Sequence, residues 1–192
     1  DLVDYVLADI LRQDVQLVVH GMGEGRYFNL FSCAEGEYRG KEAARFTMDH
    51  VLAHQIYAGS DLFLMPSQFE PCGLSQMIAM RYGTLPIVRE TGGLRDTVLS
   101  YNEFSGEGNG FTFFNYNAHD MLHTIERALM YYHSKPEIWK KLQHRGMNGD
   151  FSWNHSAEEY LNLYRRLFEP IPTTDEVSIE EPNPVVVDIK AE

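Results

Sequence analysis

The feature that most constrains the fold is a strand–loop–helix–strand pattern between residues 62 and 88. The first strand-like run is Leu62-Phe-Leu-Met65, a helix-like run extends from Leu74 to Tyr82, and the second strand-like run is Leu85-Pro-Ile-Val88. Short apolar runs that alternate with helices predict parallel strands covered by helices on both faces. In such open sheets, ligands bind at the carboxyl ends of the strands. The loop between the first strand and the helix is therefore the first candidate site.

That loop combines a carboxylate, a thiol and a glycine at the point where the helix begins, namely Glu70, Cys72 and Gly73. The free N–H groups at the start of a helix favour phosphate and other anions. A carboxylate placed directly after a buried strand is costly unless it meets a ligand or a positive charge. The sequence therefore predicts an anion site with Glu70 beside it.

The rest of the chain continues the alternation of helices and strands. We expect helices at about 1–11, 26–33, 49–58, 117–133, 136–147 and 155–168, and strands at 16–19, 42–47 and 110–114. This order predicts an α/β fold, a Rossmann-like parallel sheet flanked by helices, over residues 1–168. From Pro170 onward the chain holds four of its eight prolines and six acidic residues, so 169–192 is expected to be an acidic, proline-containing tail.

Composition narrows the class of protein. The chain has 192 residues, 44% of them hydrophobic, which suits one domain of ordinary size. A net charge of −12 argues against a nucleic-acid or anionic-membrane partner. No apolar run approaches the roughly 20 residues that a membrane-spanning helix needs. With only Cys33 and Cys72 present, we expect no disulfide framework and a reducing, cytoplasmic setting.

Several other features have two readings. The glycines of Gly21-Met-Gly-Glu-Gly25 either form a ligand-contacting loop or simply a tight turn. His54 lies in mid-helix, where a core or surface role is the default. Cys72 could be a nucleophile, but no histidine partner is fixed near it in the sequence, so a role in contacting the ligand fits better. Ser67 and Ser75 lack the Gly-x-Ser-x-Gly pattern of hydrolases. We expect no metal site, on the interpretation that the histidines and acidic residues form no His-x-x-x-His or comparable ligand pair.

Five segments resemble the donor half of bacterial glycogen and starch synthases, which are retaining glucosyltransferases of the GT-B fold that use ADP-glucose. The segments are Ser67–Gln76 (with the string Phe-Glu-Pro-Cys-Gly-Leu), Tyr82–Val88, Thr91–Val98, Leu52–Asp61 and Asp150–Tyr160. The resemblance extends over residues 1 to about 168, and the Phe-Glu-Pro-Cys-Gly-Leu string is highly specific.

The resemblance implies a role for each residue of the candidate loop. Glu70 would be the catalytic residue, contacting the hydroxyls of the donor glucose and supporting positive charge at its anomeric carbon. Cys72, Gly73, Leu74 and Ser75 would offer backbone N–H groups, and Ser75 also its hydroxyl, to the sugar and the distal phosphate.

Three further residues are implied at the donor. His54 and Met48 would border the nucleotide, and Gly21 would contact the donor from the glycine loop. Relatives often have a tyrosine where Met48 stands, so the base is expected to stack less specifically here. Related retaining families carry a second glutamate eight residues after the first; here that position is Ile78, which fits the glycogen synthase group.

The implied reaction needs ADP-glucose, an α-glucan acceptor, no cofactor and no metal. The Arg and Lys that hold the diphosphate in this family, and the first strand of the domain, have no counterpart in this sequence. We therefore expect a gap in the sheet between the strands at 16–19 and 62–65 and a missing N-terminal GT-B domain. We also expect no transfer by this chain alone, and self-association through uncovered surface.

Two alternative functions are open. One is another retaining nucleotide-sugar transferase, of sucrose or trehalose type, and the other is a non-catalytic nucleotide- or glucan-binding module.

Overall fold

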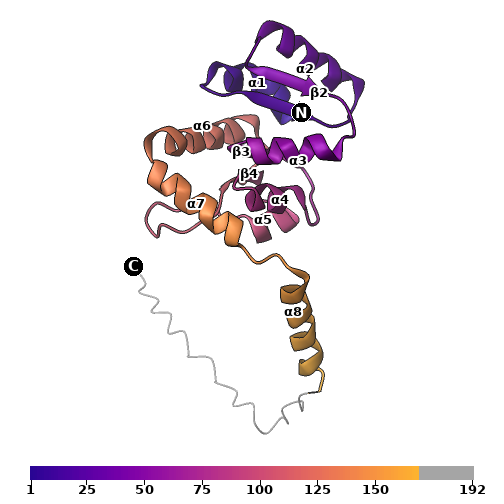
Figure 1. Ribbon diagram of the computed structural model, residues 1–192, viewed down its shortest axis with the longest axis vertical. Helices are drawn as coiled ribbons and strands as arrows, with labels where there is room; N and C mark the ends of the chain where they lie inside the picture. The colour runs from indigo at the N-terminus through magenta and orange to yellow at the C-terminus, as the bar shows by residue number, and fades with distance from the viewer. Residues whose placement is uncertain (169–192) are drawn as a thin grey trace, which may run out of the picture. The chain divides into compact units, whose positions relative to one another are not determined.

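The computed structural model describes residues 1–168, so the predicted tail at 169–192 lies outside the described residues. The chain divides into two compact units, Asp1–Gly149 and the residues from Asp150 onward. In chain order the elements are α1 Leu2–Arg12, β1 Leu17–His20, α2 Gly25–Glu37, β2 Glu42–Arg45, α3 His50–Gly59, β3 Leu62–Met65, α4 Ser75–Arg81, β4 Leu85–Arg89, α5 Gly92–Thr97, β5 Phe111–Phe113, α6 Ala118–Ser134, α7 Pro136–Asn148 and α8 Trp153–Arg166 (Figure 1). The predicted α/β alternation is confirmed.

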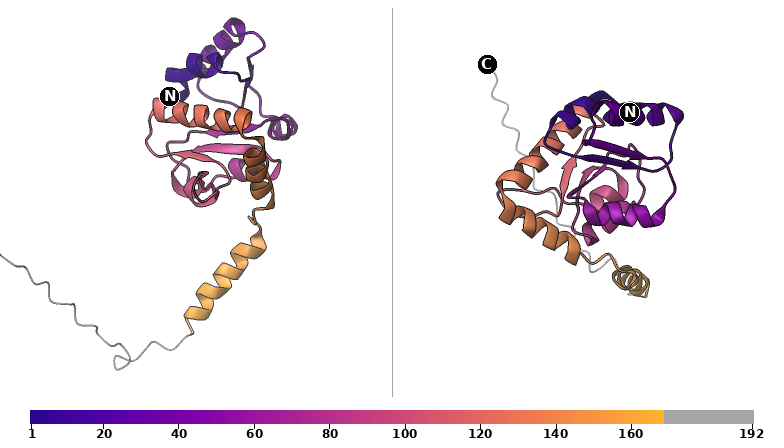
Figure 2. Two further views of the ribbon diagram at one scale, coloured as in Figure 1. Left: turned by 90° about the vertical axis from the view of Figure 1, so that its left-hand side faces the viewer. Right: turned by 45° about the horizontal axis from the view of Figure 1, so that its top comes forward.

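The strands form two parallel sheets. In the first, β1 pairs with β2, with Leu17 opposite Glu42. In the second, the order is β3-β4-β5, with Leu62 opposite Leu85 and Ile87 opposite Phe111. Within residues 1–168 no ladder joins β1 to β3, so the sheet is interrupted at the place where the sequence predicted a gap (Figure 2).

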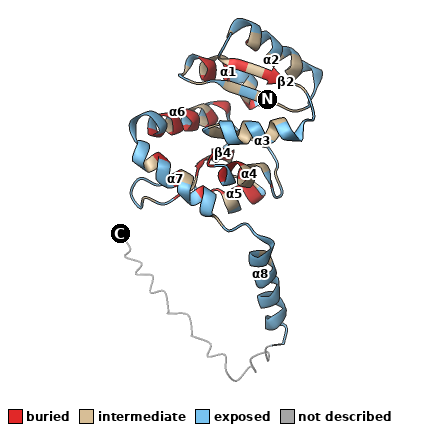
Figure 3. Cartoon of the chain, viewed as in Figure 1, coloured by how far each residue is buried: buried red, intermediate tan, exposed pale blue. Residues whose placement is uncertain are grey.

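Both faces of β4 are covered by helices. Leu85 and Ile87 belong to the large core cluster with residues of α6 such as Met121, whereas Val88 packs with Met80 of α4 on the opposite face. This division follows from the alternation of side chains along a strand. Figure 3 shows the buried positions gathered on the inner sides of these layers. The second sheet therefore lies between two helical layers, as expected for an α/β fold.

Helix α1 contributes to two cores at once. Its residues Leu2, Val6 and Ile10 join the large core cluster that includes β4 and α6. Its residues Leu7 and Leu11 pack instead in a cluster with Ala34 of α2 and, half-buried, Leu17 of β1. The sequence prediction of a helix at about 1–11 is confirmed, and the two apolar sides of this helix connect the separate sheets.

The sequence prediction failed for one element and misjudged the length of two others. Helix α5 was not expected, because its opening pair Gly92-Gly93 has low helix propensity. Helix α2 continues to Glu37 rather than ending near residue 33, and β2 ends at Arg45 rather than at 47. Tertiary contacts decide such boundaries more than local propensity does.

The unit that begins at Asp150 contains α8, which starts at Trp153, close to the predicted 155–168. Ser152 is its N-cap, and its hydroxyl accepts a hydrogen bond from the amide of His155 at 3.3 Å. Asp150 in turn accepts from the amide of Ser152 at 3.0 Å, and hydrogen bonding to Ser152 lowers the pKa of the Asp150 carboxyl. The serine in the Asp150–Tyr160 segment thus has a local structural role.

One carboxylate is buried although the surrounding core is mainly apolar. Glu42, the first residue of β2, is 4% exposed, and neither oxygen of its carboxylate has a hydrogen-bond partner among the described residues. The pKa of Glu42 is raised to about 6, chiefly by burial and also by the neighbouring carboxylate of Glu35, while Arg45 acts in the opposite direction. Burying the charged form is unfavourable, so the folded state holds this proton more tightly than the unfolded chain.

We expect Glu42→Gln to stabilise the protein at pH 8 by up to about 2 kcal/mol. The folded pKa is about 6 and the ordinary value is 4.5. The acid form therefore contributes stability below the ordinary value, and this contribution is lost as the pH rises through the folded pKa. Urea unfolding of both proteins at pH 4 and pH 8 measures the effect, with exposed Glu107→Gln as the control. A stability difference that is the same at both pH values would contradict the expectation.

Candidate functional site

The loop from Pro66 to Leu74 leaves the carboxyl end of β3 and enters α4. Glu70 is half-buried in it, and none of the side-chain hydrogen bonds or ion pairs among residues 1–168 involves its carboxylate. Two apolar side chains flank it at the surface, Phe69 with 81% and Leu74 with 68% of its area exposed. The carboxylate therefore lies at the sheet edge without a recorded partner among the described residues, and its contact with a ligand stays a prediction.

The backbone of the loop is fixed from inside through its carbonyl groups. The Arg89 guanidinium donates from Nη1 to the carbonyl of Gln68 at 2.8 Å. The amide of Gly93 donates to the carbonyls of Glu70 and Pro71 at 3.2 and 3.1 Å. These contacts come from the end of β4 and the start of α5, so the Thr91–Val98 segment packs directly against the loop.

A buried side chain fixes the remaining carbonyls. Gln76, with 0% of its area exposed, donates from Nε2 to the carbonyl of Gly73 at 2.9 Å and to that of Cys72 at 3.3 Å. The same nitrogen donates to the hydroxyl of Thr97 at 3.0 Å, and that hydroxyl donates to the carbonyl of Gly93 at 2.6 Å. Gln76 therefore connects α4, α5 and the loop.

Because a trans peptide directs its N–H opposite to its C=O, inward carbonyls leave amides directed outward. The carbonyls of Pro71, Cys72 and Gly73 point inward, so the N–H groups of Cys72, Gly73 and Leu74 point to the other side. None of these amides, nor that of Ser75, donates to an acceptor within the described part of the chain. Successive free amides of this kind form a concave anion-binding nest. Glu70 and the four predicted amide donors thus lie on one loop, and their roles stay predictions.

Glycines make this close approach possible. Gly73 has φ +74°, and a Cβ there would lie 2.6 Å from Oε1 of Gln76. Gly92 has φ +43°, and a Cβ there would lie 2.1 Å from the carbonyl oxygen of Glu70. Gly93 has ordinary backbone angles, yet a Cβ on it would lie 2.1 Å from the carbonyl oxygen of Cys72. The loop and α5 are therefore in backbone-to-backbone contact, which only glycine permits.

The other residues predicted to bind the donor make no recorded contact with this loop. Gly21 follows the carboxyl end of β1 with φ +141°, and Met48 follows β2 with 75% of its area exposed. His54 lies on α3, where its Nδ1 is 3.1 Å from the hydroxyl of Tyr82 and its ring packs edge-on against Tyr57. Their roles toward a nucleotide stay predictions.

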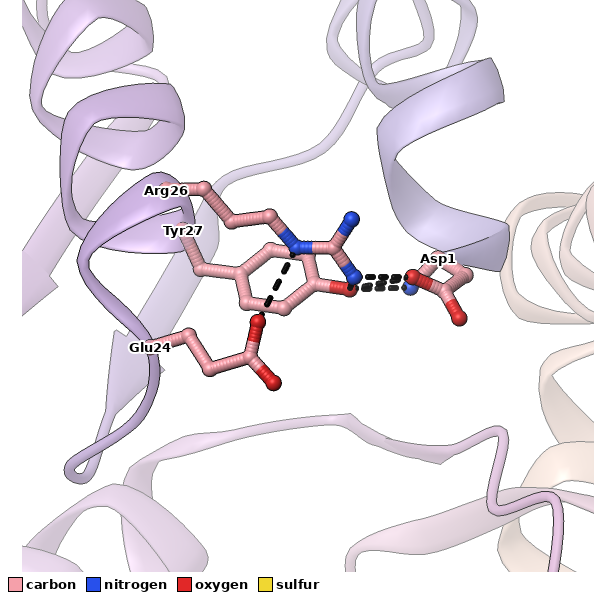
Figure 4. A network of polar contacts seen from close by, with 4 residues as sticks. All are labelled: Asp1, Glu24, Arg26 and Tyr27. Atoms are coloured by element: carbon pink, nitrogen blue, oxygen red, sulfur yellow. Dashed lines mark hydrogen bonds and ion pairs between the residues drawn. The ribbon is translucent and has the colours of Figure 1, made fainter.

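A polar network follows the glycine loop at the start of α2 (Figure 4). The carboxylate of Asp1 accepts from Arg26 Nη2 at 2.5 Å and from the Tyr27 hydroxyl at 2.5 Å, and Glu24 pairs with Arg26 Nε at 3.2 Å. Arg26 therefore meets two carboxylates, and its charge is already matched before any ligand arrives.

Features of other kinds of site are found away from the loop. A pocket of about 270 Å³ lies between the segment before β5 and α7, lined by Tyr101, Ser105, Gly106, Ile138, Lys141, Leu142 and Arg145. Two histidine pairs stand four residues apart on helices, His50 with His54 and His119 with His123, so the expectation that no His-x-x-x-His pair occurs was wrong. Residues 1–168 contain no group of three or more potential ligands that could hold a metal. Among the same residues, no helix is both long and apolar enough to span a bilayer.

Sequence reasoning missed three residues that shape the site: Gln76, Arg89 and Gly93. The Gly-Gly pair at the start of 92–97 was the one available signal, because paired glycines after a strand indicate a close backbone approach. Gln76 and Arg89 carried no such signal, since their partners are backbone carbonyls that no sequence pattern identifies.

Comparison with known proteins places the chain among glycosyl transferases. Residues 2–143 match the family described as Glycosyl transferases group 1. A glycogen synthase of Geobacillus thermodenitrificans is 57% identical over 169 residues, which cover 88% of this chain and 35% of the relative. The chain thus spans about a third of the length of the curated relatives that it matches.

Solved structures give the same picture. The catalytic domain of Starch Synthase IV from Arabidopsis thaliana, bound to ADP and acarbose, matches with a TM-score of 0.76 and 37% identity over 86% of this chain and 35% of that one. A sucrose-phosphate synthase of Thermosynechococcus elongatus has 23% identity and a TM-score of 0.62, over 86% of this chain and 42% of its own, and shares the fold. The predicted fold class and the resemblance read from the motifs are confirmed.

Proposed function

Because the chain belongs to the glycosyl transferases of group 1, we propose that it forms the donor-binding part of a glycogen synthase. Such an enzyme transfers glucose from ADP-glucose to the non-reducing end of an α-1,4-glucan. One observation carries the proposal: an unpartnered carboxylate, Glu70, stands beside the outward amides of Cys72, Gly73, Leu74 and Ser75. The arrangement offers a sugar contact and a phosphate contact on one loop.

The chemistry of glucosyl transfer matches these two contacts. When the bond between the anomeric carbon and the phosphate oxygen breaks, positive charge develops on the sugar and negative charge on the diphosphate. The bond is replaced by one to the 4-hydroxyl oxygen of the acceptor, whose proton departs with the ADP. Glu70 would hold the sugar hydroxyls and support the positive charge, while fixed amide dipoles would stabilise the phosphate. These amides need no reorganisation, because their carbonyls are already held from inside.

Further partners complete the proposed enzyme. We infer that the acceptor glucan and additional cations for the diphosphate are met by a second domain, since the relatives are about three times as long as this chain. Both cysteines are free and exposed, which suits a reducing, cytoplasmic compartment.

Binding calorimetry with ADP-glucose, UDP-glucose and ADP tests the proposal. We expect Glu70→Gln to weaken ADP-glucose binding about tenfold, a loss of about 1.4 kcal/mol, while ADP affinity is unchanged. Only the sugar contact is altered, and the amides that face the phosphate stay in place. Glu107→Gln, on an exposed loop, serves as the control with the same chemical change. Tighter binding of UDP-glucose than of ADP-glucose, or a Glu70→Gln variant with wild-type affinity for ADP-glucose, would contradict the proposal.

A further inference from the structure

Arg89 occupies an unusual place at the carboxyl end of β4. Its Nη1 donates to the carbonyl oxygen of Gln68 at 2.8 Å, two residues before Glu70. Its guanidinium carbon lies 5.6 Å from the centre of the Tyr116 ring, in the segment that follows β5. The cation is therefore held between the loop backbone and an aromatic face, an arrangement that suits the planar guanidinium.

The position of Arg89 carries an energetic penalty, because one of its donors is buried without a partner. Nε of Arg89 is buried and has no hydrogen-bond partner among the described residues. A buried donor without a partner is unfavourable. Sites where a protein keeps such a local penalty are frequently functional ones. Arg89 thus makes its contact with the loop backbone while one of its own donors stays unpartnered.

Three residues hold the loop backbone, and each of them binds a different part of it. Gly93 holds the carbonyls of Glu70 and Pro71, and Gln76 holds those that follow. Arg89 makes the side-chain contact to the part of the loop that precedes Glu70. Without it, the backbone on one side of Glu70 is fixed and the other side is not.

We propose that Arg89 is a positioning residue, which sets the direction of Glu70 by holding the Gln68 peptide. The inference rests on the proposed function in one respect only, namely that Glu70 contacts the donor sugar. Arg89 itself is assigned no contact with the donor. A lysine could keep one hydrogen bond to the Gln68 carbonyl but not the planar packing on Tyr116, so it should restore part of the effect.

A measurement that needs no ligand tests the positioning directly. In the full chain labelled with ¹⁵N, we expect Arg89→Met to lower the relaxation order parameters of the Phe69 and Glu70 amides from about 0.85 to below about 0.6. Arg89→Lys should give intermediate values. Arg95→Met, on an exposed position of α5, is the control and should leave both amides unchanged. Order parameters in Arg89→Met equal to those of the wild type would overturn the proposal, and so would an equal loss in the control.

A second measurement separates this inference from the proposed function. The ratio of the dissociation constants for ADP and ADP-glucose reports the sugar contact alone. We expect Arg89→Met to reduce this ratio about fivefold and Arg89→Lys to recover about half of that loss, with Arg95→Met at the wild-type value. If the wild-type chain shows no preference for ADP-glucose, the proposed function fails, while the relaxation data still decide the role of Arg89. A wild-type ratio in Arg89→Met overturns the link between Arg89 and Glu70.

Discussion

Replacing Gly93 by alanine is expected to destabilise the protein by about 3 kcal/mol or more and to displace the Glu70 loop. The added Cβ would lie 2.1 Å from the carbonyl oxygen of Cys72 and 2.6 Å from its carbonyl carbon, and both atoms belong to the backbone. No rotation of a side chain relieves such an overlap, so α5 and the loop must separate. The bonds from the Gly93 amide to Glu70 and Pro71 would then lengthen. Urea unfolding followed by circular dichroism measures the loss.

Gly36→Ala is the matched control for this change. Gly36 lies within α2, and a Cβ there would meet no atom within 4 Å. Alanine has the higher helix propensity, so this variant should be more stable by about 0.5–1 kcal/mol. Equal effects at the two glycines would show that the contact between α5 and the loop is not a constraint.

The change Gln76→Glu is expected to destabilise the protein by about 3 kcal/mol or more at pH 8. The amide nitrogen of Gln76 donates to the Gly73 and Cys72 carbonyls in a fully buried position. A carboxylate in its place has no hydrogen to donate and sets a negative charge against two carbonyl oxygens. Burial raises the pKa of such a carboxyl, so the loss should diminish as the pH falls and the group takes up a proton.

Thermal and urea unfolding at pH 5 and pH 8 measure this second effect. Gln55→Glu makes the same chemical change at an exposed position of α3 and should alter stability by less than about 0.5 kcal/mol. A small loss for Gln76→Glu at pH 8, or a loss that grows toward pH 5, would contradict the assigned role of Gln76.

The sequence predicted the elements whose pattern is local. The strand at 62–65 and its helix followed from apolar runs and a glycine. An anion site beside Glu70 followed from the position of a helix start after a strand, whereas the individual amides of Cys72 to Ser75 were implied by the family resemblance. The pattern of α1 was clear because its apolar residues recur at helical spacing over the whole helix.

The parts that escaped prediction depend on contacts between distant segments. Helix α5 begins with two glycines because its backbone touches the loop, a reason that propensity cannot reveal. Gln76 resembled any polar helix residue, although its side-chain amide is buried against two nearby loop carbonyls and against the hydroxyl of Thr97, 21 positions away. The burial of Glu42 at the start of β2 likewise contradicts the usual exposure of glutamate, and no pattern in the sequence around it indicated that it would be buried.

The most direct test of the donor site is a titration of the ¹⁵N-labelled chain with ADP-glucose, followed in ¹H–¹⁵N correlation spectra. Amides that donate a hydrogen bond to a phosphate or sugar oxygen shift in proportion to bound ligand. We predict saturable shifts at Cys72, Gly73, Leu74 and Ser75, because these N–H groups face outward without acceptors among the described residues. Saturable shifts confined to the pocket lined by Tyr101, Lys141 and Arg145, with those four amides unchanged, would contradict the assignment of the site.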